Sequence, residues 1–380
     1  VILNANSGNS NITLSQNNNA FGSISLRALD ANIVENLGDN GTALGTVEVE
    51  SLDLASSGAV TGSAIIKVSD EISIVAGEGL ESVTLDNVDN RLNRVSVAGT
   101  DAKITNSQDT VLLKLDVGTF NLTTIGDVTD SPDDELNVAG LAVIDAGSEG
   151  SIILGTNIND TAQFGSVQFS GDQIDISQPD DVTIAGINAQ SKLNITSTGG
   201  NIESIAESSI SAGLATTLTV DRSDGNIDLQ ASNNVFGELS IVGRDVFVSE
   251  ADDIIIGNID VDSLLLSSST GSIGNTNRST IGVLLLADLS ADGDIVIGDG
   301  AADLVNFGRL SLNALNASVI ESSGTILSSL EIAQNLELFS ANSIADDENA
   351  VLNVVGNAKF VVSGQPQSIF LDGANNRFGS

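Results

Sequence analysis

Acidic side chains are the residues of this sequence whose types and spacing could do chemistry. The pairs Asp180-Asp181 and Asp252-Asp253 occupy the same place in two copies of a sequence repeat, Asp109 matches the second position of these pairs, and Asp133-Asp134-Glu135 and Asp346-Asp347-Glu348 form a second class of acidic turn. Ca²⁺ takes about six to eight oxygen ligands, of which a lone pair supplies few. The glycine-rich calcium-roll motif is also absent. We interpret these residues as solvated turns, with calcium binding as the alternative.

Catalysis by His or Cys is excluded, because the chain contains neither residue. Polysaccharide lyases combine acidic calcium ligands with a basic catalytic residue on a parallel β-helix. The nearest approaches to basic clusters are Lys103 with Lys114 and Arg91 with Arg94, and neither lies within a convincing acidic constellation. We therefore predict no enzyme, no cofactor, and no catalytic, cofactor-binding or metal-binding residues. A lyase-like enzyme is the least favoured alternative.

The charge of the chain limits its partners. Its 51 acidic and 13 basic residues give a formal net charge of −38. Nucleic acids and anionic membrane surfaces are bound through Lys and Arg, so this balance argues against both. No apolar run approaches the roughly 18 residues of a membrane span. We expect no nucleic acid partner and no membrane insertion.

The elements that carry these residues follow a repeat marked by a Phe-Gly dipeptide. The dipeptide occurs at Phe21-Gly22, Phe164-Gly165, Phe236-Gly237, Phe307-Gly308 and Phe378-Gly379, and Leu92-Asn93 takes its place midway between the first two. We call these positions the anchors. Their spacing predicts a partial repeat in 1–20, five repeats of about 71 residues at 21–91, 92–163, 164–235, 236–306 and 307–377, and the start of another at 378–380, all in one continuous solenoid.

Each repeat begins with short alternating strands. Apolar residues stand three and five positions after each of the first five anchors, always with a polar residue between them: Ile24 and Leu26, Val95 and Val97, Val167 and Phe169, Leu239 and Ile241, Leu310 and Leu312. A second apolar pair stands ten and twelve positions after the anchor: Ala31 and Ile33, Ala102 and Ile104, Ile174 and Ile176, Val246 and Val248, Ala317 and Val319. This period of two predicts strands with one buried face.

The strand spacing predicts an all-β fold, a right-handed parallel β-helix (β-solenoid) with about three rungs per repeat. About 24 residues fit one rung, and turns rich in Gly, Asn, Asp and Ser separate the strands. Some 16 turns, stacked about 4.8 Å apart, would make a rod of about 75 Å. A string of small β-sandwiches is the alternative, but sandwiches usually bury Trp or Tyr, which this chain lacks.

Two positions at or near each anchor suggest a turn. The glycine that follows Phe, which is replaced by Asn93 in the second repeat, predicts a left-handed backbone conformation at a corner. Asn recurs two residues before the anchor at Asn19, Asn90, Asn234 and Asn376, and we expect a local turn role for it.

The stretches 12–26 (ITLSQNNNAFGSISL), 227–257 and 369–380 (IFLDGANNRFGS) resemble the long repeats of filamentous-haemagglutinin-like bacterial surface proteins. In that family an alternating strand leads into Asn-x-Phe-Gly and a second alternating strand. The resemblance implies a right-handed parallel β-helix that is secreted and displayed on a bacterial cell surface.

The favoured function is a structural rod segment of a secreted adhesin or extracellular fibre. The alternative is a β-helix module that binds a surface carbohydrate or protein. Because the sequence starts partway through a repeat and stops just past an anchor, we expect either a longer native chain or end-to-end association, through the unpaired strand edges of the terminal turns.

Overall fold

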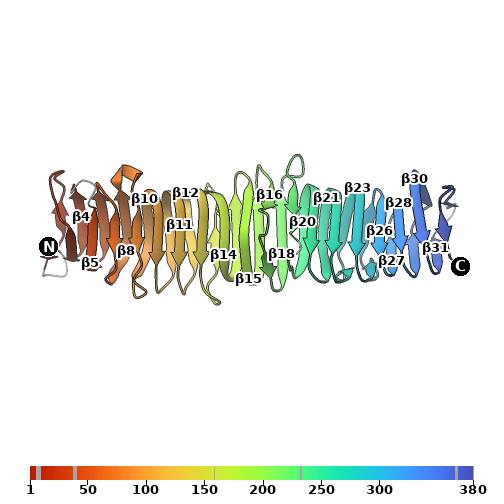
Figure 1. Cartoon of the computed structure of the whole chain (residues 1–380), viewed down its shortest axis with the longest axis horizontal. Helices are drawn as coiled ribbons and strands as arrows, with labels where there is room; N and C mark the ends of the chain where they lie inside the picture. The colour runs from red at the N-terminus through yellow and green to blue at the C-terminus, as the bar shows by residue number, and fades with distance from the viewer. Residues whose placement is uncertain (6–9, 37–40, 158, 232, 364–366, 380) are drawn as a thin grey trace. The chain divides into compact units, whose positions relative to one another are not determined.

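The computed structural model describes residues 1–5, 10–36, 41–157, 159–231, 233–363 and 367–379. Residues 6–9 of the predicted partial repeat and Ser380 of the last one lie outside the described residues. The chain divides into two units, Val1–Gln190 and Ser191–Ser380. Within the described residues the only helical segment is the short 3-10 helix η2 (Gly77–Gly79). Parallel strands of 2 to 18 residues make up most of the rest, so several are longer than the short strands predicted (Figure 1).

The strands of the first unit are β1 (Ile2–Asn4), β2 (Ile12–Leu14), β3 (Ser23–Arg27), β4 (Asp30–Glu35), β5 (Thr42–Val49), β6 (Ser51–Ser56), β7 (Val60–Gly62), β8 (Ile66–Ala76), β9 (Val83–Leu85), β10 (Arg91–Thr105), β11 (Thr110–Thr123), β12 (Val128–Asp145), β13 (Ile152–Leu154) and β14 (Thr161–Gln178). The strand β15 (Val182–Ser197) spans the boundary between the units.

The strands of the second unit are β16 (Ile202–Ser204), β17 (Ile210–Ala212), β18 (Ala215–Val220), β19 (Ile227–Leu229), β20 (Glu238–Glu250), β21 (Ile254–Ser268), β22 (Ile273–Asn275), β23 (Thr280–Ala291), β24 (Ile295–Ile297), β25 (Leu304–Phe307), β26 (Leu310–Ala314), β27 (Ala317–Glu321), β28 (Thr325–Ile332), β29 (Leu336–Ser340), β30 (Ile344–Val354), β31 (Ala358–Val362), β32 (Ile369–Phe370) and β33 (Arg377–Phe378).

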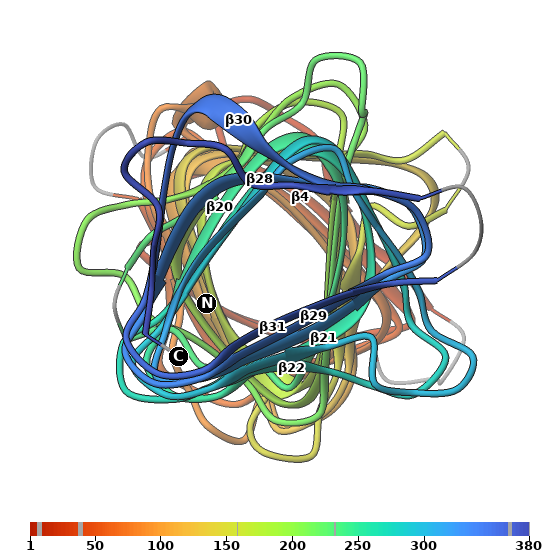
Figure 2. The ribbon, with the colours of Figure 1, turned by 90° about the vertical axis from the view of Figure 1, so that its right-hand side faces the viewer.

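Each unit is a parallel β-solenoid, and the whole chain makes about 17 turns. In the first unit β11 pairs in parallel with β10 on one side and with β12 on the other. In the second unit β21 does the same between β20 and β23. The view along the coils in Figure 2 shows strands joined by turns around a central core. The predicted parallel β-solenoid, with repeats of about 70 residues, is confirmed.

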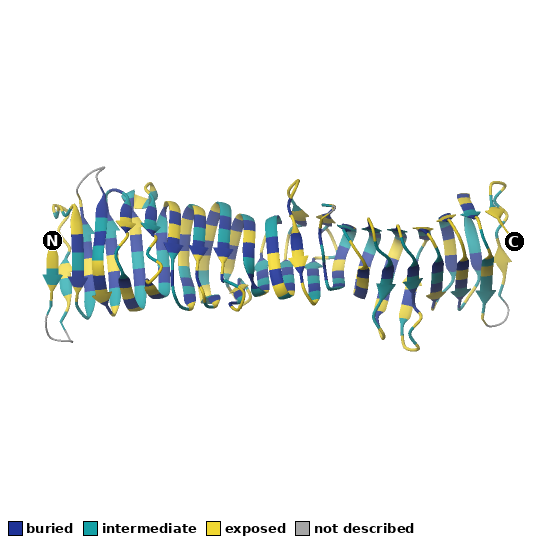
Figure 3. Ribbon diagram, turned by 60° about the horizontal axis from the view of Figure 1, so that its bottom comes forward, coloured by how far each residue is buried: buried dark blue, intermediate teal, exposed yellow. Residues whose placement is uncertain are grey.

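The core consists of the inward-facing residues of the alternating strands. All ten predicted residues at three and five positions after the first five anchors are at most 3% exposed, and the ten at ten and twelve positions after them are equally buried. The residues between them face outward or are half-buried, so buried and exposed positions alternate along the strands (Figure 3). The alternation of apolar and polar residues in the sequence therefore identified these core residues correctly.

One repeat is a little longer than three turns. Ala31 lies beside Leu52, Leu52 beside Ile72, and Ile72 beside Val95. The second strand of one repeat is therefore in line, three turns later, with the first strand of the next. The second unit repeats this step from Val246 through Leu264 and Ala287 to Leu310. Consecutive anchors thus occupy different positions around the coil.

Candidate functional site

The most regular polar feature of the structure is a buried side chain at one fixed offset after each of the first five anchors. Its carbonyl or carboxylate oxygen accepts a hydrogen bond from the backbone N–H of the anchor residue. The five donor–acceptor pairs are Phe21 with Glu35 (3.3 Å), Leu92 with Asn106 (2.9 Å), Phe164 with Gln178 (2.8 Å), Phe236 with Glu250 (2.6 Å) and Phe307 with Glu321 (3.0 Å). We call each pair an anchor corner. The five acceptor side chains are at most 2% exposed.

Alternation explains why these polar residues face inward. Ala31 and Ile33 point into the core, so Glu35 must do so as well because the strand β4 continues to that residue. A buried polar group is tolerated when it is hydrogen-bonded, and the anchor N–H supplies that bond. The sequence carried a signal for this site in the form of Glu, Asn or Gln at one fixed offset, but our sequence analysis did not identify it.

Hydroxyl groups complete the corner in some repeats. Thr42 donates to Glu35 (2.8 Å), and Ser56 donates to the same carboxylate oxygen (3.2 Å). Glu321 accepts bonds from Thr325 and, at 2.9 Å, from Ser323. Each of these carboxylates therefore has hydroxyl donors as well as the anchor N–H.

Glu250 lacks this support. Ile254 follows Glu250 at the place where Thr325 follows Glu321. Among the described residues the Oε2 atom of Glu250 has no hydrogen-bond partner, and the residue is 0% exposed. Burial raises the pKa of Glu250 to about 8, and the negative charges of Asp252 and Asp253 add to the effect, whereas the N–H of Phe236 opposes it. Glu250 is therefore largely protonated at neutral pH, which makes it resemble Gln178 in the preceding repeat.

The glycine that follows Phe has a different cause from the predicted one. Among the described residues the glycines with positive φ are Gly41, Gly77, Gly79, Gly147, Gly155 and Gly298, so no anchor glycine is in the left-handed region. The prediction of a left-handed corner was wrong. A Cβ on Gly165, Gly237, Gly308 or Gly379 would instead lie well inside 3.0 Å of a backbone carbonyl oxygen of the preceding turn. Glycine is needed because the two backbones approach closely.

Asn93 takes the place of the anchor glycine in the second repeat, where the backbone differs. The register shifts at this point, since Leu92 lies beside Val68 but Arg94 lies beside Glu71. The Nδ2 atom of Asn93 donates to the carbonyl oxygen of Ser69 (3.3 Å). The bulge makes room for a side chain, which then satisfies a carbonyl of the preceding turn.

The asparagine before the anchor occupies a turn, as expected, and also bridges coils. The backbone N–H of Asn90 donates to Asn87 (3.2 Å), which closes the turn. Its side chain accepts from the N–H of Ile66 in the preceding turn (2.9 Å) and donates to the carbonyl oxygen of Thr105 (3.1 Å). Asn234 makes the equivalent contacts in the second unit.

The acidic pairs bind groups of the neighbouring turn. Asp109 accepts from the N–H of Asp127 (3.0 Å), and Asp253 accepts from that of Ser272 (2.8 Å). Asp180 accepts a bond from the side chain of Gln163 (2.8 Å). The matching sequence positions Asp109 and Asp253 therefore share one structural role, which is to cap the N–H of the following turn.

From Asp253 onward this contact extends into a turn ladder. In each step a side-chain oxygen accepts from the backbone N–H of the next member, at 2.8–3.2 Å. The members are Asp253, Ser272, Asp294, Asn316, Asn335 and Asn357. The ladder adds a row of hydrogen bonds to those of the strands, along one edge of the second unit.

The second class of acidic residues does not lie in turns between strands, as predicted, but within the strands β12 and β30, where the register shifts. Asp346 accepts from the N–H groups of Gly373 (3.0 Å) and Asp372 (3.3 Å) and from the side chain of Asn376 (2.7 Å). Although partial burial acts in the opposite direction, these bonds hold the pKa of Asp346 below its ordinary value. Asp347 forms an ion pair with Arg309 (3.1 Å).

The other acidic run lies in a crowded carboxylate cluster. Asp133 donates its backbone N–H to Asp160 (3.1 Å), and Glu135 forms an ion pair with Lys114 (3.2 Å). Burial, together with the charges of Asp160 and Asp134, raises the pKa of nearby Asp130 to about 6. Within the described residues no three ligating side chains converge to hold a metal ion.

The structure separates the basic residues that the sequence placed close together. Lys103 lies beside Asn121, and Lys114 is occupied by its ion pair with Glu135. Arg94 pairs with Asp70 (3.4 Å), whereas Arg91 lies beside Lys67 of the preceding turn. Arg91 therefore lies next to Lys67, whereas Arg94 is held by its ion pair with Asp70.

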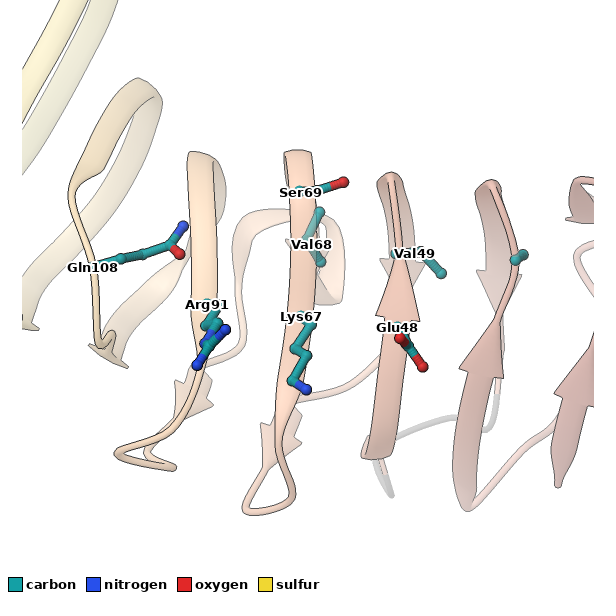
Figure 4. A pocket seen from close by; sticks show the side chains of 8 residues that line it. Glu48, Val49, Lys67, Val68, Ser69, Arg91 and Gln108 are labelled. Carbon is teal, nitrogen blue, oxygen red and sulfur yellow. The ribbon is translucent and has the colours of Figure 1, made fainter. Parts of the chain in front are cut away.

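Arg91 and Lys67 line an open groove of about 390 Å³ on the first unit. Figure 4 shows Gln108, Arg91, Lys67 and Glu48 on successive coils of the chain. Glu48 also forms an ion pair with Arg27 (3.6 Å). The floor is formed by strand residues such as Val68, which is 1% exposed. The groove is polar at its rim and open to solvent.

These features define a parallel β-solenoid built from repeats of about 70 residues, with hydrogen-bonded corners and turns. The chain belongs to the family described as repeats of unknown function (DUF5649), whose model it matches over residues 31–98, 99–168 and 314–380. Neither the curated proteins nor the solved structures gave a significant match. Among the described residues no helix has the length and apolar character that crossing a membrane requires.

Proposed function

We propose that this chain is a structural rod segment of a secreted bacterial surface adhesin or extracellular fibre, without catalytic activity. The observation that carries the proposal is that successive turns are bound to each other by strand pairing and, from Asp253 to Asn357, also by the side chains of the turn ladder. Such an array gains length by adding turns and does not need a larger core. The resemblance to filamentous-haemagglutinin-like repeats supports a location on the bacterial cell surface.

Electron microscopy of the purified chain tests the rod. About 17 turns at about 4.8 Å per turn predict particles roughly 80 Å long and one solenoid wide. Compact, near-spherical particles would contradict the proposal. Antibodies against the chain should label intact cells of its source, and labelling only after permeabilisation would contradict the surface location.

We also propose that further turns stack on the terminal turns, either from a longer chain or from a second copy. The strands β1 and β33 offer the same backbone donors and acceptors that pair successive turns inside each unit. Filaments at high concentration support stacking of copies, and isolated particles at every concentration argue against it.

A further inference from the structure

Two pairs of neighbouring segments, one in each unit, are built alike. Each pair has a first part in one turn and a second part in the following turn, and the second part includes an aspartate four residues before a Phe-Gly anchor. The first segment pair consists of 130–134, where the register of β12 shifts, with Gly155, Asn157 and Asp160. The second segment pair consists of 275–279 with Gly298, Gly300 and Asp303.

The two segment pairs share three hydrogen bonds from the backbone. A glycine with positive φ donates its N–H to the first side chain of the pair. The aspartate accepts from a residue with a φ of 69° in the preceding turn, and from the residue three places before itself. In the first pair the donors and acceptors are Gly155 with Asp130, Asp133 with Asp160 (3.1 Å) and Asn157 with Asp160 (2.9 Å). In the second pair they are Gly298 with Asn275 (2.8 Å), Arg278 with Asp303 (2.6 Å) and Gly300 with Asp303 (2.8 Å).

The two segment pairs differ in their first side chain. Asn275 lies beside the core residue Ile256, and Asp130 lies beside the core residue Leu112, so both polar groups stand in line with the core. The Nδ2 atom of Asn275 donates to the carboxylate of Asp303 (2.8 Å), which joins the two turns directly. An ionised Asp130 can only accept hydrogen bonds, so it cannot make this contact with the aspartate of its own pair.

Negative charges surround Asp130. Burial raises the pKa of Asp130 to about 6 against the hydrogen bond from Gly155, and the charges of Asp160 and Asp134 add to the effect. Arg94 of β10 lowers the pKa of Asp134, but burial and the charge of Asp160 keep it raised. The cations on the preceding strands form ion pairs with other acids, Arg94 with Asp70 and Lys114 with Glu135.

We propose that the first segment pair is a pH-sensitive contact, which is closed while Asp130 carries a proton and opens when Asp130 and Asp160 are both ionised. A protonated carboxyl group can donate a hydrogen bond, as the amide of Asn275 does in the second pair. After ionisation two half-buried carboxylates repel each other, and residues 131–134 separate from the following turn. The strand pairing on either side of 131–134 does not depend on this contact, so its failure would leave the rod function standing.

Hydrogen exchange of the full chain between pH 4 and pH 7 tests the proposal through the amide of Gly155, which donates to Asp130. The contact is fully closed below the ordinary pKa of 3.8 and weakens as the pH rises through about 6, the pKa of the closed state. A tenfold change per pH unit between these values gives a fall of about a hundredfold in the protection factor of Gly155.

Two other amides are the controls in the same experiment. The amide of Gly298 donates to the uncharged Asn275 and should lose far less protection over this range. The amide of Thr124 donates to the backbone carbonyl oxygen of Asp145 (2.8 Å), so it reports unfolding of the first unit and should also change far less. Equal falls at Gly155 and Thr124 would overturn the proposal, because the whole unit would then be opening.

Two reciprocal variants make the test specific. Asp130→Asn gives the first pair the amide that the second pair already has, and it should abolish the fall in protection of Gly155. Asn275→Asp makes the opposite change and should create such a fall at Gly298. Constant protection of Gly155 in the unmodified chain, or an equal fall in Asp130→Asn, would overturn the proposal. Constant protection of Gly298 in Asn275→Asp would overturn the equivalence of the two segment pairs, on which the proposal rests.

Discussion

Replacing Glu250 by Gln should stabilise the second unit at neutral pH. In the folded chain Glu250 is 0% exposed, and its pKa is raised to about 8 from an ordinary value of 4.5. Between these two pH values the folded state holds a proton that the unfolded state has released. Stability due to this group is therefore fully present below pH 4.5 and is lost as the pH rises toward 8.

The magnitude follows from proton linkage. Each pH unit between the two pKa values costs about 1.4 kcal/mol, so at pH 7 the carboxyl group lowers the stability by up to about 3 kcal/mol. Glutamine has no such cost. At the equivalent place Gln178 accepts from Phe164 and donates to the carbonyl oxygen of Asp181 (2.9 Å). Because the amide of the substituted side chain must find a similar acceptor, we expect a net gain of about 1 to 3 kcal/mol at pH 7.

Thermal unfolding of Glu250→Gln and the unmodified chain from pH 4 to pH 9 measures this effect. The two midpoints should coincide near pH 4 and separate with rising pH up to about pH 8. Hydrogen exchange of the Phe236 amide, which donates to Glu250, reports the same change locally and does not require two-state unfolding of a long repeat array.

Two companion variants sharpen the test. Ile254→Thr places a hydroxyl where Thr325 supports Glu321, so it should lower the pKa of Glu250 and flatten the pH dependence. Gln178→Glu creates an unsupported carboxyl group in the first unit, where Val182 takes the place of Ile254, and should introduce the same loss of stability with pH. A midpoint difference between Glu250→Gln and the unmodified chain that does not change with pH would refute the reasoning.

Three further predictions concern the anchors and the loops. Gly308→Ala should lower the free energy of unfolding by about 1 to 3 kcal/mol, because its Cβ would collide with the carbonyl oxygen of Leu284. In the control Gly274→Ala the Cβ has only ordinary contacts, so thermal or denaturant unfolding should show less than half of that loss. Phe307→Ala should lower the free energy of unfolding by about 3 to 5 kcal/mol, because this side chain is buried. Phe307→Leu should lower it far less, because Leu92 occupies the equivalent position in the second repeat. Equal losses in the two variants would contradict a packing role. Asp346→Asn should destabilise above pH 4, and the difference should shrink as the pH falls further, since the depressed pKa of Asp346 contributes stability that is lost on acidification. A loss that does not change with pH would show that charge is not involved.

Local alternation predicted the strands and the core because it depends on the geometry of the strand alone. Ile24 and Leu26 face inward for the same reason as their counterparts in every repeat, and no long-range information is needed to place them. The polar member of the anchor corner was accessible to the same reasoning, since Glu35 continues the alternation of Ala31 and Ile33. It was missed because a charged residue suggests exposure until a donor such as the N–H of Phe21 is known to lie opposite it.

Other features could not be predicted because they depend on which residues lie beside each other in adjacent turns. The clash that requires Gly237 involves the carbonyl oxygen of Leu214, in the preceding turn. A row of charged residues on paired strands is a second example, since the steps from Arg27 to Glu48, from Glu48 to Lys67 and from Lys67 to Arg91 all differ in length. Because the turns vary in this way, no single period in the sequence aligns these residues.

The length of the repeat explains where functional surfaces should be sought on this solenoid. One repeat slightly exceeds three turns, so residues at equal positions in consecutive repeats lie at different places around the coil. A motif that recurs once per repeat therefore builds the framework, as the anchor corners do, but cannot by itself form a continuous surface. Continuous surfaces arise from residues one turn apart, as in the turn ladder from Asp253 to Asn357 and in the row of charged residues on paired strands from Arg27 to Arg91. A binding surface of this protein should therefore follow the turns and not the repeat.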